Sequence, residues 1–377
     1  MKKIIQQAFF QLRNQPLLSV ITVLGTALAI ALIMVILIVY QAKTADYAPE
    51  VNRSRSLYVK WERTVYDKKD PNSAGHSRPS LWLVKEIFYP LTTPEAVTAT
   101  YEGGEVLVGT VGSDEEMNTP LMLTDAAFWK VYQFRFLAGK PFTEADFQSG
   151  MKQAVIAKSV ARRLFGGAEN AIGKDILVNF AAYTVCGVVD DVNRFCEFTW
   201  SEVYAPYTSN AIASEAEAGQ TSGNNVITIL ARSTDDFDAI RNEVARGVAQ
   251  INTTLGDMEL QLMGQPDNFR MQLNRKFANQ YENLNANFWK YGIMILIIFW
   301  FPAINLSGLT NTRMRRRLEE LGIRKAFGAT RNELVWQVLN ENLVLTVMGG
   351  LLGLALAYLF LWLMSDWLLQ TVWGATA

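Results

Sequence analysis

The chain has 377 residues, half of them hydrophobic and 19% charged, with 35 basic and 36 acidic side chains. A soluble chain of this length carries about 25% charged residues, so a large part of this sequence must be nearly free of charge. The balanced charge argues against a nucleic-acid-binding protein that acts through a strongly basic surface.

The first apolar segment is residues 17–40, which contain no charged residue. As a helix it would reach about 36 Å, more than the ~30 Å hydrocarbon layer of a bilayer. Lys2 and Lys3 precede it, as in a signal peptide, but the apolar region of a signal peptide is only about 7 to 15 residues long. We therefore expect a retained transmembrane anchor, preceded by a cytoplasmic amphipathic helix over residues 1–16.

Two further apolar segments, residues 288–310 and 337–364, lie in the C-terminal third of the chain. The first overlaps a charge-free stretch from Tyr291 to Thr312, and the second is centred on Leu343 to Met364. The buried core helix of a soluble protein rarely stays free of charge over such a length. Both segments are predicted to be transmembrane helices.

Basic residues collect in the short segments beside these helices. Residues 1–16 and 311–341 together carry ten basic and four acidic side chains. The positive-inside rule therefore places the N-terminus and the loop 311–336 in the cytoplasm. Residues 41–287 are then periplasmic, as is the C-terminal tail 365–377.

The periplasmic part is large enough to fold around its own core. Short β-type runs alternate in it with helical patterns, which indicates an α+β fold. The strand at 226–230, a helix capped by Ser233 or Thr234 and the strand at 258–263 predict a β-α-β unit. The other predicted elements are strands at 153–156 and 183–189 and a helix at 159–165 ended by Gly166 and Gly167; the apolar face of the capped helix is Phe237, Ile240, Val244, Val248 and Ile251.

The expected fold class is an α-helical membrane protein with a large inserted α+β periplasmic domain. A polar stretch over residues 208–225 suggests a boundary between two lobes. We expect a membrane-distal lobe, roughly residues 100–210, to be inserted into a membrane-proximal lobe. The polar, Gly-free and Pro-free stretch 269–290 predicts a continuous helical stalk that runs into the second span, or else a surface helix packed on the domain.

Candidate catalytic residues are few. His76, the single histidine, lies in a loop-like stretch and cannot form a multi-histidine metal site, so no catalytic residue and no metal ligand is predicted. Cys186 and Cys196 are expected as buried thiols, with a disulfide as the alternative. The segment 167–175 resembles a phosphate-binding loop, but its glycine spacing is one residue too long and Asp175 replaces the Ser or Thr that would bind magnesium. Any ATP-driven work therefore needs a separate partner.

The cytoplasmic loop is the most informative stretch. A short helix is predicted to end near Gly328, with Arg324 and Lys325 in its last turn, where cations are favourable. Thr330 and Glu333 have the spacing of a capping box and predict the start of the next helix. Such a loop is suited to touch a cytoplasmic protein; the alternative is a basic loop that only sets the membrane orientation.

The block Glu320–Thr330, ELGIRKAFGAT, resembles the cytoplasmic signature of FtsX/MacB-type ABC transporter permeases. Four outer segments are similar to the periplasmic core of that family, and they occur in the same order. They are residues 134–139, 154–166, 172–174 and 183–188.

The resemblance implies a permease subunit that is not itself an enzyme. Two copies, identical or related, would pair in the membrane, and each would present a coupling helix to a cytoplasmic ATP-binding subunit, which binds ATP and Mg²⁺; the chain itself would bind no cofactor. ATP-driven closure would move the periplasmic domain by mechanotransmission. The implied coupling surface is Glu319, Glu320, Gly322, Arg324, Lys325 and Gly328, and the implied small-residue packing positions, in the dimer or within one bundle, are Gly349, Gly353 and Ala357. Ordinary membrane-helix composition would also explain these small residues.

The resemblance also implies a multi-pass protein of the bacterial inner membrane that exports or extracts a substrate from the periplasmic side. Further partners would be membrane lipids and a periplasmic adaptor or lipoprotein, and no nucleic acid. The alternative is a regulator of periplasmic cell-wall hydrolases; a tethered ectoenzyme is a more distant one. Family members have four spans and this sequence has three, so we expect a chain cut short of its fourth span rather than a three-span variant.

Overall fold

The computed structural model describes residues 16–70, 72–110, 112, 115–214, 218–275, 277–278, 289, 292–293, 296–297, 300, 322–323 and 325–369. Residues 1–15 of the predicted helix over residues 1–16, and most of the predicted second span, lie outside the described residues. The chain divides into two compact units. One unit is Met1–Ala42 with Asn283–Leu368, and the other is Lys43–Glu282 with Leu369–Ala377.

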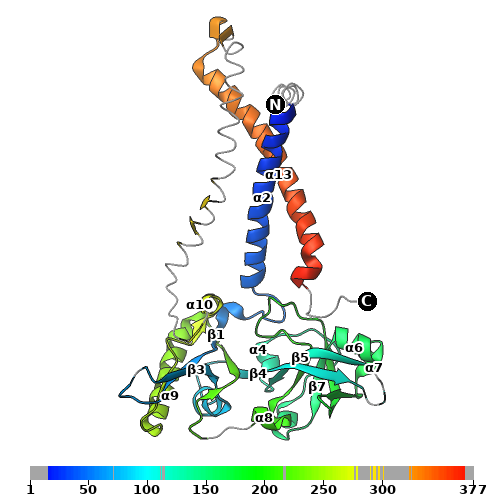
Figure 1. The fold of residues 1–377 in the computed structure, drawn as a ribbon, viewed down its shortest axis with the longest axis vertical. Coiled ribbons are helices and arrows are strands. Elements are labelled where there is room, and N and C mark those ends of the chain that lie inside the picture. Colours follow the sequence, from blue (N-terminus) through cyan, green and yellow to red (C-terminus); the bar gives the residue numbers. More distant parts are fainter. Residues whose placement is uncertain are drawn as a thin grey trace. The chain divides into compact units, whose positions relative to one another are not determined.

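The first unit contains two long helices, α2 (Pro16–Thr44) and α13 (Arg331–Leu369) (Figure 1). Within the described residues, both are long and apolar enough to cross a membrane, by length and composition. Large apolar side chains such as Leu28 and Leu351 are exposed, so neither helix resembles the buried core helix of a soluble protein. The predicted first and third helices are confirmed as helices, and α13 also includes the end of the predicted cytoplasmic loop.

A ten-stranded mixed sheet organises the second unit (Figure 1). Its order is β14-β1-β12-β4-β5-β10-β7-β9-β6, and β8 pairs with both β4 and β9. The pairs β5/β10 and β7/β9 are parallel and the others antiparallel. The strands are β1 (Ser56–Val59), β4 (Ala96–Gly109), β5 (Glu116–Thr124), β6 (Phe136–Gly139), β7 (Gln153–Ala157), β8 (Asp175–Val178), β9 (Ala181–Val189), β10 (Val203–Pro206), β12 (Asn225–Leu230) and β14 (Asp267–Asn268).

A smaller four-stranded sheet has the order β11-β3-β2-β13. Its strands are β2 (Glu62–Val65), β3 (Ala74–Pro79), β11 (Ser222–Gly223) and β13 (Glu259–Gln261). His76 belongs to β3, where it is opposite Arg63 of β2 with an exposed side chain, so its predicted place in a loop is wrong. The pairing with β2 holds this segment extended even though its sequence is typical of a turn.

Helix α9 (Phe237–Thr254) begins after a capped turn, as predicted. Ser233 accepts a hydrogen bond from the backbone of Asp235, and Ile240, Val244 and Ile251 are buried. The predicted β-α-β unit is wrong, because β12 lies in the large sheet and β13 in the small one. Both edges of β12 are already occupied, by β1 and β4, so β13 pairs with β2 instead.

Short helices and turns connect the strands. Helix α6 ends at Gly166, whose φ of 75° is the left-handed conformation that glycine adopts easily, as predicted. The short helices are α3 (Leu81–Leu83), α4 (Phe128–Val131), α5 (Glu144–Gln148), α6 (Lys158–Phe165), α7 (Ala168–Ala171), α8 (Ala211–Ser214) and α10 (Phe269–Asn274); a π-helical turn η2 (Val84–Phe88) and the 3-10 turns η1 (Arg53–Arg55), η3 (Tyr207–Ser209) and η4 (Thr234–Asp236) complete the unit.

Two hydrophobic clusters cover the faces of the large sheet. Leu57 and Val59 of β1 belong to the larger cluster, whereas Tyr58 belongs to the smaller, aromatic one. Because successive side chains of a strand point to opposite faces, the two clusters lie on opposite sides of β1. One continuous sheet contains the strands of both predicted lobes, and the division into lobes stays a prediction.

The stretch predicted as a stalk begins as a helix but does not continue as one from Phe269. Helix α10 ends at Asn274, and Arg275 has an extended backbone. The reason is tertiary: the buried side chain of Arg275 is bound to Asp267. Most of the remaining predicted stalk lies outside the described residues.

Candidate functional site

The predicted cytoplasmic loop, which carries the predicted coupling residues, ends in a tight turn. Phe327 N donates to Ile323 O and Gly328 N to Lys325 O, each at 3.1 Å. Gly328 has a φ of 95°, which side-chain-bearing residues rarely adopt. The predicted helix end at Gly328 is therefore confirmed.

A capping box starts α13 directly after this turn. The Glu333 carboxylate accepts hydrogen bonds from the backbone N of Thr330 at 2.9 Å and from its hydroxyl at 3.0 Å, while Glu333 N donates to Thr330 Oγ1 at 3.4 Å. The backbone N–H of Thr330 lowers the pKa of Glu333. The predicted cap is confirmed, and it fixes where the loop becomes a helix.

Of the predicted coupling residues, the structure describes Gly322, Lys325 and Gly328; Glu319, Glu320 and Arg324 lie outside the described residues. Two apolar side chains beside them are exposed: Ile323 is 59% exposed and Phe327 88%. In the sequence, Ile323 and Phe327 are an apolar pair four residues apart in an otherwise charged loop. A prediction based on charge alone does not single them out.

The small-residue stripe of α13 faces α2 of the same chain. A β-carbon on Gly349 would lie 2.8 Å from Cβ of Thr26, and one on Gly353 would lie 2.7 Å from the carbonyl oxygen of Ala27. Ala357, the next residue at this spacing, is buried. Close approach of helix backbones at small residues is the usual packing of apolar helices in membranes.

The described residues hold no group of three or more His, Cys, Asp or Glu side chains that could bind a metal ion. Cys196 is buried and Cys186 half-buried, and both are free thiols. Burial raises the pKa of Cys186 to about 12 and that of Cys196 to about 11. Such thiols stay protonated at neutral pH and are poor nucleophiles.

The segment that resembles a phosphate-binding loop is part of the sheet. Gly173 N donates to Val185 O at 2.9 Å, and Lys174 N donates to Ala171 O at 3.1 Å. Val185 N donates back to the carbonyl oxygen of Lys174 at 2.8 Å. These amides are therefore not free to bind a phosphate.

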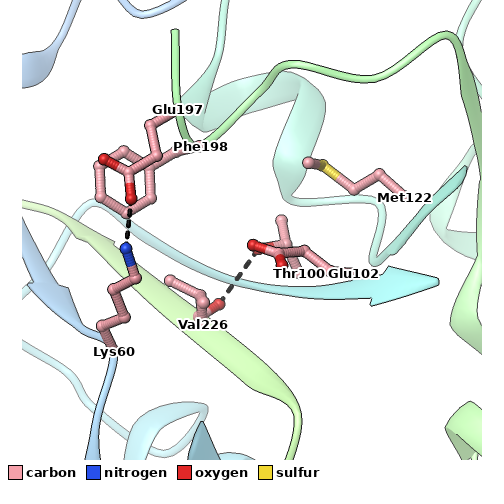
Figure 2. A pocket seen from close by; sticks show the side chains of 7 residues that line it. All are labelled: Lys60, Thr100, Glu102, Met122, Glu197, Phe198 and Val226. Carbon is pink, nitrogen blue, oxygen red and sulfur yellow. Dashed lines mark hydrogen bonds and ion pairs between the residues drawn. The ribbon is translucent and has the colours of Figure 1, made fainter. Parts of the chain in front are cut away.

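A hollow in the second unit is lined by both charged and apolar side chains (Figure 2). Lys60 forms an ion pair with Glu197, and Glu102 pairs with Arg78 at 3.0 Å. Its charged groups are therefore matched within the protein. The lining residues are Lys60, Thr100, Glu102, Met122, Glu197, Phe198 and Val226.

Two protein-family models match the chain and together cover most of it. The model of the MacB-like periplasmic core domain matches residues 19–246. The model of the FtsX-like permease C-terminal region matches residues 291–377.

Named relatives are distant in sequence. An uncharacterized ABC transporter permease, YknZ of Bacillus subtilis (strain 168), is 23% identical over 90% of this chain and 81% of that protein. The macrolide export ATP-binding/permease protein MacB of Wolinella succinogenes is 24% identical over 93% of this chain, which spans about half (52%) of that longer protein. The match to the crystal structure of the periplasmic region of MacB from Actinobacillus actinomycetemcomitans covers 60% of this chain and 96% of that structure's chain, with 14% identity and a TM-score of 0.40.

The first family model alone matches more than half of the chain, and the second matches the region with the charged loop and α13. The resemblance noted in the sequence is therefore confirmed. The chain belongs to the family of MacB/FtsX-type ABC transporter permeases.

Proposed function

We infer that the chain is the permease subunit of an ABC transporter, in which a separate cytoplasmic ATPase drives movement of the periplasmic domain by mechanotransmission. The observation that carries this proposal is the continuity of α13. The helix begins at the capped turn beside the coupling loop and runs for 39 residues, about 58 Å, through its apolar part Asn342–Leu363. A rigid helix of that length transmits a displacement of the loop to the far side of a bilayer.

The chemistry of the coupling loop supports a protein partner. Phe327 and Ile323 are exposed apolar groups, and Lys325 lies between them in the sequence. An exposed aromatic side chain that enters a pocket of a partner provides much of the binding energy of a protein interface. Lys325 would add electrostatic complementarity at the rim of the contact.

The membrane arrangement follows from the charge distribution. In this proposal α2, the second predicted span and α13 cross the bacterial inner membrane, with residues 311–336 in the cytoplasm and residues 41–287 in the periplasm. The close contact of Gly353 with Ala27 supports packing of α2 and α13 within one bundle.

The partners are part of the proposal. ATP and Mg²⁺ are bound by the ATP-binding subunit, and two permease copies, identical or related, pair in the membrane. The substrate is exported or extracted from the periplasmic side, with an adaptor or lipoprotein as a further partner. The Wolinella relative is named as a macrolide exporter, which supports export as the direction of transport.

Co-purification with the ATP-binding subunit tests this proposal. The full chain and an ATPase encoded beside it are co-expressed, solubilised and isolated through a tag on the permease. We expect a complex with ATPase activity, and we expect Phe327→Glu to lower the amount of bound ATPase at least tenfold. Phe180→Glu is the matched control, because Phe180 is a comparably exposed aromatic residue (80%) in the other unit. A permease that binds no ATPase, or a complex that Phe327→Glu leaves intact, would overturn the proposal.

A further inference from the structure

Two buried arginines lie at the points where the chain enters and leaves the second unit. Arg53 follows the end of α2 by nine residues, and Arg275 directly follows α10. Their carboxylate partners, Glu50 and Asp267, are fully buried. We call Glu50, Arg53, Asp267 and Arg275, together with Phe269 between them, the connector joint.

Arg53 holds the end of α2. Its Nε donates to Glu50 Oε2 at 2.7 Å, and its Nη1 donates to the carbonyl oxygens of Ala45 at 2.7 Å and Lys43 at 3.5 Å. The last carbonyl groups of a helix have no partner within the helix, and a cation is favourable there. The guanidinium group thus binds the carbonyl groups of Lys43 and Ala45, which both belong to the second unit.

The other side of the same ion pair binds a distant loop. Arg53 Nη2 donates to Phe195 O at 2.9 Å. Glu50 Oε1 accepts from Phe198 N and from Thr199 Oγ1, each at 3.0 Å. The pair therefore joins the end of α2 to a segment more than 140 residues further along the chain.

Arg275 holds the departing segment in a similar way. It forms a two-point ion pair with Asp267, in which Nη2 lies 2.9 Å from Oδ1 and Nε contacts Oδ2. Nη2 also donates to Met263 O at 3.1 Å, and Nη1 donates to Ala278 O at 3.4 Å. Since Asp267 belongs to β14, the departing segment is fixed to an outer strand of the large sheet.

The two arginines are attached to neighbouring strands. η1, which begins with Arg53, continues directly into β1, and β1 pairs with β14 so that Tyr58 is opposite Asp267. Phe269 contacts Arg53, because its ring centroid is 5.0 Å from the Arg53 guanidinium carbon. The segment that contains Arg53 and the segment that contains Arg275 therefore meet at the strand pair β1 and β14.

A buried ion pair is expensive to desolvate and adds little net stability compared with apolar residues of the same shape. A buried ion pair instead fixes the geometry of its surroundings, because the planar guanidinium group binds several oxygen atoms in set directions. We propose that the connector joint transmits movements of α2 and of the departing segment to the large sheet as one body. This inference rests on the proposed function of mechanotransmission and assigns the residues that would perform it.

The test uses the full permease with its ATP-binding subunit in lipid nanodiscs. A spin label at Glu169→Cys, an exposed site in α7, reports the distance between the two copies with and without ATP and vanadate. The native thiols are buried or half-buried, so the label selects the introduced cysteine. ATPase activity and bound ATPase are measured on the same samples.

The joint variants replace each ion pair by neutral groups of similar shape, Glu50→Gln with Arg53→Met and Asp267→Asn with Arg275→Met. Arg55→Met is the matched control for Arg53, because Arg55 lies in the same turn but binds Glu95 at 2.8 Å and Ala231 O at 3.1 Å. Arg241→Met is the control for Arg275, because Arg241 binds Pro266 O and Asp238. Both controls remove an arginine without touching the joint.

We expect the joint variants to retain bound ATPase and ATP hydrolysis while losing at least half of the nucleotide-dependent distance change that wild type and the controls show. Amide exchange at residues 45–47 should also be at least tenfold faster in the Arg53 variant than with Arg55→Met. A full distance change in the joint variants overturns the joint and leaves the proposed function standing. A wild-type complex that hydrolyses ATP without any distance change overturns both. If the double variants do not fold, the same distance is measured with Arg53→Lys. Lysine keeps the charge but cannot bind the three carbonyl groups at once, so this variant should also lose the distance change. A full distance change with Arg53→Lys overturns the proposed connector joint.

Discussion

Gly353 of α13 lies against Ala27 of α2 so closely that a β-carbon at position 353 would be 2.7 Å from the Ala27 carbonyl oxygen. The neighbouring Gly350 has more room, since its β-carbon would lie 3.6 Å from Cδ1 of Ile30, an ordinary van der Waals distance. Two glycines in one helix therefore differ in whether a methyl group fits, which makes them a matched pair for mutation.

Gly353→Ala should destabilise the packing of α2 and α13, because the added methyl group meets backbone that cannot move aside. The expected loss in unfolding free energy is about 1–3 kcal/mol, as for overpacking in a core. Gly350→Ala should be neutral or stabilise by up to about 1 kcal/mol, because alanine favours the helix more than glycine does. Unfolding of both variants by denaturant in mixed micelles measures the difference; an equal effect would contradict the packing.

Glu62→Gln should stabilise the second unit at pH 8. The Glu62 carboxyl group is fully buried beside Thr64 and Ser222, and burial raises its pKa while hydrogen bonds from these two hydroxyl groups oppose the rise. The folded protein therefore holds a proton on Glu62 at a pH where the unfolded chain has lost it. The stability that this proton contributes is full below the pKa of Glu62 in the unfolded chain and is lost as pH rises through its pKa in the folded protein.

Glutamine stays neutral at every pH, so this loss should disappear in the variant. Unfolding by urea at pH 4, 6 and 8 should give Glu62→Gln a flatter stability profile than wild type, with the gain largest at pH 8. Glu116→Gln, at an exposed site on β5, serves as the control and should leave the profile unchanged. A variant that is less stable than wild type at pH 8 would contradict the prediction.

Thr330→Ala should fray the start of α13, because it removes the hydroxyl group of the capping box. Loss of such a cap costs about 1 kcal/mol, which is roughly a fivefold faster amide exchange over the first turn of the helix. The cap should also weaken on acidification. The pKa of Glu333 is lowered by the Thr330 backbone N–H, so its contribution is present above the unfolded pKa and lost as pH falls through the folded one. Exchange at residues 331–334, followed by mass spectrometry from pH 7 to pH 3, measures both effects.

Cys186 and Cys196 should resist alkylation at pH 8 in the folded protein, because burial raises the pKa of Cys186 to about 12 and that of Cys196 to about 11. In urea without a reducing agent, both should react fully with iodoacetamide, adding two alkyl groups to the intact mass. If urea exposes no reactive thiol until a reducing agent is added, the two cysteines form a disulfide and the prediction is wrong.

Local sequence signals predicted much of the fold correctly. The cap at Ser233, the apolar face of α9 at Ile240 and Val244, the helix end at Gly166 and the turn at Gly328 are all present as expected. Each depends on residues within a few positions of one another, so the interaction energies that fix them are visible along the chain.

The predictions that were wrong depended on contacts between residues far apart in the chain. β13 joins the small sheet because β12 has no free edge, and α10 ends at Arg275 because Asp267 binds that side chain. The sequence does not predict the exposure of Phe327, because its neighbours in the chain are charged. Strand partners and buried ion pairs are chosen by competition among groups far apart in the chain, which no local pattern records.

Apolar length, charge and cap spacing are local properties, so the residues alone predicted the family, the two long apolar helices and the capped turn between the coupling loop and α13. The folded chain was needed to show that Arg53 binds both Ala45 and Phe195, and that Gly353 rather than Gly350 touches the backbone of α2. Burial brings together side chains and carbonyl groups separated by more than 140 residues, and only folding sets which of them lie within hydrogen-bonding distance.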